Sequence, residues 1–288
     1  MSGRRARPAG LWRWTGGKGR LLGPLFELMD RRAVWESEPH YRQWVVPFFG
    51  GGADAAEAMR RRMALSFVFG DKCHAGLLAA RRWSEVERTL RALLCLPLTV
   101  QRATYYAFRA SEEVPAEPIV TWQDGPWPPS RETWATLRFL FLLATNFNGV
   151  WRVNRAGRYN VPFGRRGSVD WEVFAEFATL LAANAVTWLA GDFEATVALA
   201  GVGDLVYADP PYLGTHDYGG FTEADHVRLV TALRAAAARG ATCWASGSDC
   251  ADTRRVYAPR VEHVLTVKRS VAAASESRGN KTELLMEL

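Results

Sequence analysis

The sequence has few of the features that mark membrane, secreted or metal-binding proteins. Its apolar runs stay below the roughly 18 residues that a membrane-spanning helix needs, and no apolar core follows the basic N-terminal stretch, as a signal peptide requires. The four cysteines (Cys73, Cys95, Cys243 and Cys250) show no CxxC spacing, and the five histidines do not cluster with them. We therefore expect buried free thiols, neither disulfides nor a metal site, and a cytoplasmic protein.

Acidic residues are missing from two stretches of the chain. Residues 1–20 contain six basic residues and no acid, and this excess of positive charge equals the net charge of +6 of the whole protein. Residues 145–166 contain five arginines and no acid, and aromatic and amide side chains lie between them. Such stripes are typical of proteins that bind a polyanion. For residues 2–7, a solvated, disordered tail is an equally good interpretation.

The order of apolar segments predicts an open α/β sheet. Strands are expected at 43–49, 65–69, 205–208 and 241–246, with a closing pair at 264–267 and 283–288, and helices at 21–29, 55–63 and 223–239. Further helical patterns cover 75–96, 133–145 and 169–189, and a loop with five prolines covers 115–129. Because the helices from 75 to 145 interrupt the alternation of strands and helices, we expect two domains. Residues 1–75 and 169–288 would form a Rossmann-like catalytic domain, and residues 76–168 an inserted domain.

The segment 204–212 combines a buried strand with groups that can bind a flat heterocycle. The apolar residues 205–208 are followed by Asp209, Pro210, Pro211 and Tyr212. The prolines have no N–H for strand pairing, so their carbonyls become rigid hydrogen-bond acceptors. Asp209 adds an acceptor and Tyr212 a ring face, at the strand end where α/β sheets place ligands. This set suits the exocyclic amino group of a base, although a plain Pro-Pro turn is the alternative.

Two glycine turns precede helices and indicate a small-ligand site. Residues 14–18 read Trp-Thr-Gly-Gly-Lys, and the strand at 43–49 leads into Gly50-Gly51-Gly52. Glycines of this kind allow the backbone to approach a ligand closely, but the G-x-G-x-x-G spacing of a pyrophosphate site is absent. Asp71 ends the second strand, the usual place for a ribose-hydroxyl partner, with an Asx turn as the alternative.

Residues 146–164 predict a β-hairpin that can read DNA. Two segments rich in amide and aromatic residues are joined at Ala156-Gly157. Arginine pairs with guanine and asparagine with adenine in the major groove. A structural hairpin with solvated arginines is the alternative.

In this order, the motifs resemble those of the DNA adenine methyltransferase (Dam) family, which methylates adenine N6 with S-adenosylmethionine. Residues 209–212 resemble its DPPY motif, residues 14–18 its Trp-x-Gly-Gly-Lys motif, and residues 47–52 its Pro-Phe-x-Gly-x-Gly motif. The resemblance extends from about Trp12 to Leu285. Two positions depart from the family: Val46 stands where Glu is usual, and Cys73 where Asn is frequent.

The resemblance implies a role for particular residues. Catalysis on a flipped adenine would use Asp209, Pro210, Pro211 and Tyr212. Lys18 would meet a carboxylate at the methionine end of the cofactor, and Asp192 and Phe193 would surround its adenine, although Asp192 could equally cap a helix. The cofactor contacts implied are Trp14, Lys18, Phe48, Gly50, Gly52, Asp71, Asp192, Phe193 and Asp209. The DNA contacts implied are Phe147, Asn148, Val150, Arg152, Asn154, Pro162 and Arg165.

Other functions stay open at this point. A cytosine-N4 methyltransferase shares the chemistry but more often has Ser at the position of Asp209, and methyltransferases of RNA or of protein glutamine usually have Asn there. The hairpin argues against both. A DNA-binding protein that has lost catalysis is the third alternative, because of Val46 and Cys73. The hairpin further suggests GATC as the DNA sequence, and we expect a monomer of bacterial or phage origin, in restriction-modification or another role.

Overall fold

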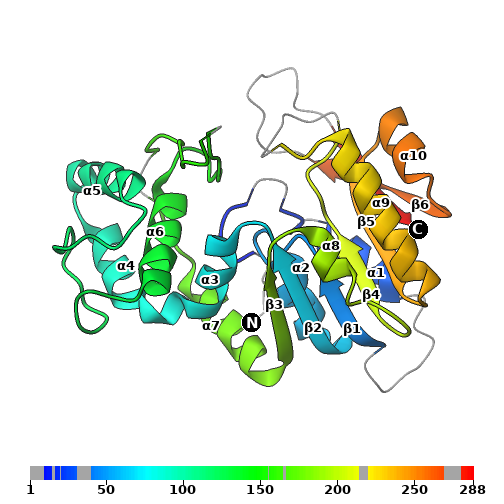
Figure 1. Ribbon diagram of the computed structural model, residues 1–288, viewed down its shortest axis with the longest axis horizontal. Coiled ribbons are helices and arrows are strands. Elements are labelled where there is room, and N and C mark those ends of the chain that lie inside the picture. Colours follow the sequence, from blue (N-terminus) through cyan, green and yellow to red (C-terminus); the bar gives the residue numbers. More distant parts are fainter. Residues whose placement is uncertain are drawn as a thin grey trace, which may run out of the picture.

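The computed structural model describes residues 10–14, 17–19, 21–30, 40–154, 156–164, 167–213, 220–268 and 280–288. Within these ranges, one seven-stranded sheet has the order β3-β2-β1-β4-β5-β7-β6 (Figure 1). The strands are β1 (Tyr41–Val46), β2 (Ala64–Asp71), β3 (Ala185–Ala190), β4 (Leu205–Ala208), β5 (Thr242–Ser248), β6 (Val261–Lys268) and β7 (Asn280–Glu287). Strands β1 to β5 are parallel, and β7 is antiparallel to both β5 and β6. The expected α/β Rossmann-like sheet is therefore confirmed.

Side chains along the strands alternate between two buried faces. Trp44 and Val46 of β1 pack on one face and Val45 on the other. The first face is covered by α1 (Leu22–Asp30), α2 (Ala53–Arg60) and α7 (Trp171–Ala183), and the second by α8 (Phe193–Val197), α9 (Glu223–Ala238) and α10 (Ala251–Tyr257). Because helices bury both faces, the central strands are apolar at successive positions instead of alternating with polar residues.

Between β2 and β3 the chain forms a group of helices beside the sheet, on the left of Figure 1. Its elements are α3 (His74–Arg82), the 3-10 helix η1 (Trp83–Glu85), α4 (Glu87–Cys95), α5 (Leu98–Ala110) and α6 (Arg131–Thr145). In its centre, Trp134 of α6 stacks on Phe108 of α5 with ring centroids 4.9 Å apart. Helix α3 packs against both α6 and β2. The apolar core of this group therefore continues into the core on the first face of the sheet.

Two sequence-based helices are wrong in extent. The helix expected over 75–96 is broken at η1, and at Val86 the backbone leaves helical geometry with φ −130°. Both Trp83 and Val86 are buried at this break, and the Trp83 ring packs against Trp171 and Phe174 of α7. The helix expected over 169–189 ends at Ala183, and residues 185–190 form β3, the edge strand that pairs parallel with β2.

Three smaller features also differ from the expectations or were not anticipated. Helices α5 and α10 had no sequence-based prediction. All four cysteines are free, but only Cys243 is buried and Cys95 is exposed at the end of α4. The expectation of buried thiols is thus wrong for Cys95.

No helix in the described parts of the chain is long and apolar enough to cross a membrane.

Candidate active site

Strand β4 ends at the carboxyl edge of the sheet, where the polar residues begin. Leu205 to Ala208 are fully buried and pair with β1 on one side and β5 on the other. At the start of β4, the carboxylate of buried Asp204 accepts hydrogen bonds from Arg42 (2.6 Å) and from the N–H of Gly201 (2.8 Å). These bonds fix β4 against β1, so Asp209 has a defined place between the ends of two neighbouring strands. The strand order reverses at this point, where α/β sheets bind ligands.

Asp209 belongs to a charged cluster built from both ends of the chain. Lys18 Nζ lies 3.0 Å from Asp209 Oδ1, 3.4 Å from Glu283 Oε2 and 4.3 Å from the centre of the Tyr212 ring. The Tyr212 hydroxyl donates a hydrogen bond to Glu283 Oε2 at 2.8 Å. Burial raises the pKa of Asp209, and the positive charge of Lys18 opposes this rise. Burial also raises the pKa of Tyr212 well above its usual value, so this phenol stays neutral.

Two acids near this cluster were not anticipated from the sequence. Glu283 comes from β7, and Asp54 comes from the first turn of α2. Burial, and next the negative charge of Asp209, raise the pKa of Asp54 to about 7. Asp54 follows directly on the Gly50–Gly52 turn, which was a usable sequence signal. Glu283 had none, because only the pairing of β7 with β5 brings it to the site.

The glycine turn after β1 is in contact with the N-terminal motif. Gly50 and Gly52 have φ values of +53° and +70°, which favour glycine. A Cβ on Gly50 would lie 2.9 Å from the Trp14 ring, so Trp14 packs directly on the turn. The Gly50 N–H donates to Asp71 Oδ2 at 2.8 Å, and the Cys73 N–H donates to Asp71 Oδ1 at 2.7 Å. Asp71 therefore makes the Asx-type turn and also lies beside the glycine turn, with lone pairs left for a ligand.

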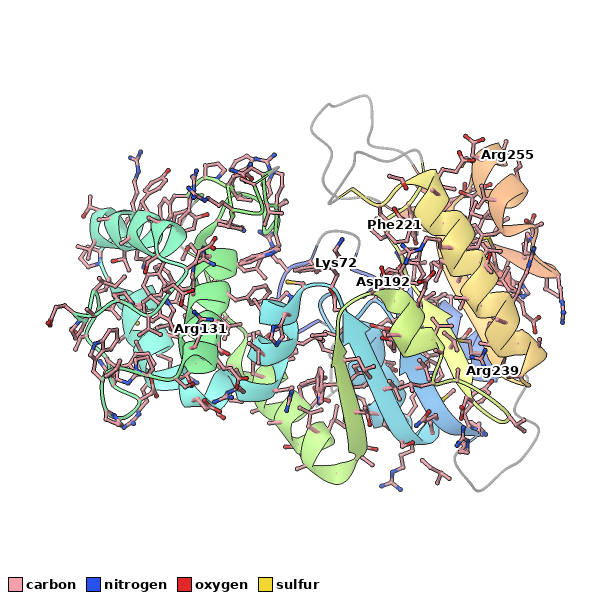
Figure 2. All side chains as sticks on the ribbon, in the orientation of Figure 1. Lys72, Arg131, Asp192, Phe221, Arg239 and Arg255 are labelled. Carbon is pink, nitrogen blue, oxygen red and sulfur yellow. The ribbon has the colours of Figure 1, made fainter. Side chains whose placement is uncertain are left out.

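Aromatic rings meet beside the same edge of the sheet. Phe48 and Phe193 stack with centroids 5.5 Å apart, and Phe221 contacts both at 5.7 and 5.8 Å. The Asp192 carboxylate caps α8 by accepting from the Glu194 N–H at 3.1 Å. Figure 2 shows Asp192 and Phe221 beyond the carboxyl ends of the parallel strands. The structure thus brings Phe48 and Phe193 together and shows the capping role of Asp192.

A buried histidine lies behind the Pro-Pro segment. His226 Nδ1 lies 2.8 Å from the Tyr257 hydroxyl, and the ring also hydrogen-bonds the backbone of Pro211. Burial lowers the pKa of His226 to about 4, so the ring is neutral at pH 7. With the Tyr257 hydroxyl donating to Nδ1, the opposite nitrogen carries the proton and donates to Pro211. His226 therefore positions the segment that carries Tyr212.

Residues 146–154 and 156–164 form an antiparallel hairpin with two isolated bridges, Asn146–Phe163 and Val153–Tyr159. The hairpin is anchored to the helical group from its inner side. The Asn146 side-chain amide donates to the Val150 carbonyl and to the Tyr159 hydroxyl, both at 2.7 Å, and the Tyr105 hydroxyl of α5 donates to the Val161 carbonyl at 2.9 Å. Of the residues expected to contact DNA, Val150 is half-buried and its carbonyl takes part in this anchoring, whereas Phe147, Asn148, Arg152, Asn154 and Pro162 are exposed.

Among the described residues of the hairpin, the exposed side chains include the ring of Phe147 and the guanidinium groups of Arg152 and Arg158. Phe147 is 57% exposed, and Asn148 follows it with φ +62°, a conformation that non-glycine residues seldom adopt. Arg152 is exposed, and its Nε donates to Asn160 Oδ1 at 2.9 Å. A Cβ on Gly149 would lie 2.7 Å from Arg13 Cβ, so the N-terminal motif also touches the hairpin.

The remaining residues expected to contact DNA differ in their exposure and hydrogen bonds. Asn154 Oδ1 accepts the N–H groups of Ala156 and Arg158, both at 3.0 Å, and so holds the turn. Pro162 is exposed, and its carbonyl accepts the Phe147 N–H at 3.0 Å. Arg165 lies outside the described residues.

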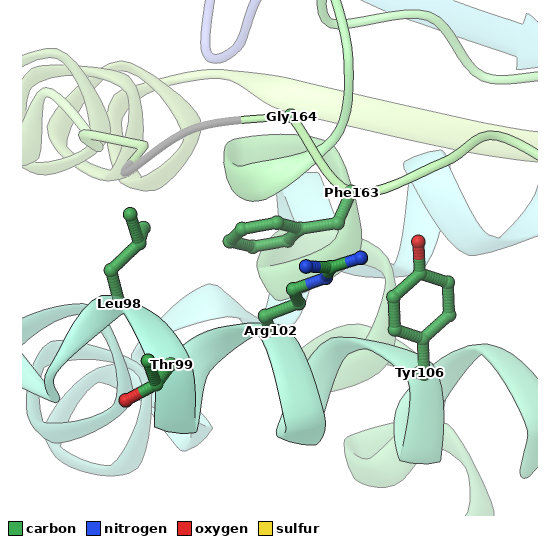
Figure 3. Close-up of a pocket in the computed structure, with 6 residues that line it drawn as sticks. All are labelled: Leu98, Thr99, Arg102, Tyr106, Phe163 and Gly164. Atoms are coloured by element: carbon green, nitrogen blue, oxygen red, sulfur yellow. The ribbon is translucent and has the colours of Figure 1, made fainter.

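A pocket of about 300 Å³ lies between α5 and the end of the hairpin (Figure 3). It is lined by Leu98, Thr99, Arg102, Tyr106, Phe163 and Gly164. Arg102 and Tyr106 come from the unpredicted helix α5, and Figure 3 shows their side chains beside the ring of Phe163. A cation and exposed ring surface therefore lie directly next to the hairpin.

Comparisons with known proteins agree with this geometry. A family described as "D12 class N6 adenine-specific DNA methyltransferase" matches residues 14–272. A type II methyltransferase of Lactococcus lactis subsp. cremoris is 28% identical over 95% of this chain and 93% of its own length. A DNA adenine methylase of Salmonella typhi is 26% identical, with 95% and 92% covered. The DNA N-6-adenine-methyltransferase of Escherichia phage P1 is 26% identical over 98% of this chain but 36% of its own.

Proposed function

The chain belongs to the D12 class of N6 adenine-specific DNA methyltransferases, and from this we propose that it methylates adenine N6 at one short sequence of duplex DNA, with the target base flipped out of the helix. The methyl donor of this enzyme is S-adenosylmethionine. The observation that carries the proposal is the 3.0 Å ion pair between Lys18 and Asp209. It joins the N-terminal motif to the segment that would meet the base.

The residues at the strand ends fit S-adenosylmethionine. Around Lys18, the described residues include three acids, Asp54, Asp209 and Glu283, and this excess of negative charge complements a ligand that has an ammonium and a sulfonium group. Asp71 would accept the ribose hydroxyls, Lys18 would meet the methionine carboxylate, and Phe48 and Phe193 would flank the adenine. Trp14 and the Gly50–Gly52 turn would close the pocket, because a Cβ on either Gly50 or Gly52 would collide with a ring. When bound, the cofactor supplies an electrophilic methyl group.

The Asp209–Tyr212 segment would hold the target amino group. The Asp209 carboxylate and the Pro210 carbonyl would accept hydrogen bonds from N6, which concentrates the lone pair on that nitrogen. Lys18 favours the ionised form of Asp209 against the effect of burial, and an ionised carboxylate is the stronger hydrogen-bond acceptor. Tyr212 would stack on the base, with its hydroxyl held by Glu283. Positioning and electrostatics then account for most of the rate enhancement.

Residues 76–168 would recognise the DNA. The hairpin presents Phe147 and Arg152 at its surface, and Figure 1 shows it on the same side of the molecule as the carboxyl ends of the parallel strands. Phe147 and Asn148 would lie beside the flipped base, and Arg152 would read a base edge. The hairpin's likeness to that of the Dam family supports GATC as the sequence.

The test is sequencing of modified bases in DNA from a methylation-free bacterial host that expresses the wild-type chain or Asp209→Ala. We expect N6-methyladenine in one short motif with the wild type and none with the variant. N4-methylcytosine would contradict the proposed target base. Absence of any modified base, in spite of measured cofactor binding by the purified wild type, would contradict the proposed reaction.

A further inference from the structure

Asp54 is a buried carboxylate that the residues around it leave incompletely paired. It lies in the first turn of α2 and is 8% exposed. Its Oδ2 atom has no hydrogen-bond partner among the described residues. Glu57, one turn further along the same helix, is similarly buried but pairs with Arg60 and Arg61. The helix therefore neutralises one of its two acids and leaves the other without a counter-charge of its own.

Asp54 shares an electrostatic environment with the catalytic cluster. The negative charge of Asp209 raises the pKa of Asp54 and the positive charge of Lys18 lowers it, while burial makes the largest contribution, so that the pKa is about 7. Lys18 is itself engaged with Asp209 and Glu283. A buried ionised carboxylate without a dedicated partner is costly to the fold, and such groups concentrate at functional sites.

The last residue of β1 cannot accept a hydrogen bond through its side chain. Val46, the last residue of β1, is fully buried and apolar, and it stands where the sequence pattern leads one to expect an acid. The next acid along the chain is Asp54, on the other side of the Gly50–Gly52 turn. Val46 and Asp54 therefore lie on either side, in sequence, of the same glycine turn, which a ligand can approach closely.

We propose that Asp54 accepts the α-ammonium group of S-adenosylmethionine, in place of the acid that is absent at Val46. The ammonium group has three N–H donors, which suit the unpartnered oxygen, whereas the sulfonium group has none. Lys18, on the same side, takes the carboxylate of the same methionine moiety. This inference rests on the proposed placement of the cofactor and names one further residue that binds it.

The inference predicts that cofactor binding is linked to a proton. In the empty site Asp54 is half ionised near pH 7, and a bound cation requires the ionised form. Affinity therefore rises with pH up to 7 and protons are released on binding. Because only the ionised fraction is competent, the affinity at pH 7 should be about 15-fold higher than at pH 5.5. This range also stays below the titration of the ligand's own α-amino group, near 7.7–8.0 in model peptides.

Isothermal titration calorimetry at pH 5.5, 6.25 and 7.0, in buffers of low and high ionisation enthalpy, tests this. We expect Asp54→Asn to bind S-adenosylmethionine about tenfold or more weakly at pH 7 and to lose both the pH dependence and the proton release. S-adenosylhomocysteine keeps the ammonium group but lacks the sulfonium group, and its affinity for Asp54→Asn should fall by the same factor. Methylthioadenosine, which lacks the methionine moiety, should bind equally to both proteins. The matched control Glu57→Gln should bind all three ligands like the wild type.

Two other results of the calorimetry would overturn the inference. Wild-type affinity and pH dependence in Asp54→Asn would show that Asp54 does not touch the ligand, and a loss confined to S-adenosylmethionine would assign Asp54 to the sulfonium. A purely structural role predicts a lower melting temperature for cofactor-free Asp54→Asn. We expect an equal or higher one at pH 8, because the raised pKa of Asp54 makes its ionisation unfavourable to the fold above pH 7. If the wild type binds no S-adenosylmethionine, the proposed function fails instead.

Discussion

Lys18 and Asp209, which are far apart in the sequence, form an ion pair of 3.0 Å in which only 6% of the lysine side chain is exposed. The lysine lies between the N-terminal motif and the segment proposed to hold the base. It also touches the face of the Tyr212 ring. One cation thus contacts both the acceptor and the ring.

Replacing Lys18 by Met should shift the pH profile of methylation. Burial raises the pKa of Asp209 and Lys18 opposes this rise, so removal of Lys18 raises that pKa further and favours the protonated acceptor. We expect kcat at pH 7 to fall at least about tenfold, because a hydrogen bond to a charged group contributes about 1.5–3 kcal/mol, and to recover in part as the pH rises. Steady-state kinetics from pH 6 to 9 measure this. A uniform loss with an unchanged pH profile would contradict it, and Lys18→Arg is the control that keeps the charge.

The contribution of Tyr212 to catalysis should come from its ring more than from its hydroxyl. Stacking of a base on an aromatic ring contributes about 1–3 kcal/mol, so Tyr212→Ala should lower kcat/KM by roughly 5- to 150-fold. Tyr212→Phe loses the hydrogen bond to Glu283 but keeps the ring, and we expect a loss below about fivefold. Single-turnover kinetics on a short duplex compare the two variants. Equal losses would show that the hydroxyl carries the effect.

Arg152 and Arg102 should affect DNA binding in different ways. Arg152→Ala should cost about 1–3 kcal/mol at one base position and relax specificity there. Arg102, beside the hairpin in the pocket of Figure 3, would meet a phosphate. Replacement of Arg102 by Ala should weaken binding to all DNA sequences alike. It should also reduce the slope of log affinity against log salt concentration by about one. Binding titrations at several salt concentrations, with cognate and altered duplexes, distinguish them. Loss of specificity in Arg102→Ala would reverse the assignment.

His226 should make the fold sensitive to mild acid. The pKa of His226 is about 4 in the folded protein, below the unfolded value of about 6.5, so the unfolded chain binds the proton more readily. Its stabilising effect is complete above pH 6.5 and declines as the pH falls towards 4. Relative to His226→Gln, the wild type should lose about 2 kcal/mol of unfolding free energy between pH 7 and 5. Urea denaturation at both pH values measures this, and a constant difference between the two proteins would refute it.

The sequence predicted best those parts of the fold where local patterns and tertiary packing agree. Strand β4 was predicted to the residue, because a fully buried run stops at two prolines. The start of α9 at Glu223 was likewise predicted, and the structure shows a capping box between Thr222 and Asp225 at this end. Strand β3 was missed because it follows α7 after one residue, so its apolar residues continued the helical count.

The composition of the candidate site was harder to predict for a different reason. Lys18 and Asp209 stand in recognisable motifs, but Glu283 becomes relevant only through the pairing of β7 with β5. At the break over Trp83–Val86, the Trp83 ring packs against Trp171 and Phe174, which are distant in sequence. Asp54 matters because it is buried beside Asp209. Contacts of this kind depend on the assembled sheet: the glycine turn draws attention to Asp54, but not to its proximity to Asp209.

The position of Glu283 on β7 has a consequence for protein synthesis. A nascent chain that has emerged as far as residue 270 already contains the hairpin, the glycine turn and Asp209. It still lacks the strand that β5 and β6 pair with, and the carboxylate that holds the Tyr212 hydroxyl. We therefore expect the ability to bind DNA to arise during translation before the ability to modify it, so that ribosome-bound chains engage DNA without marking it.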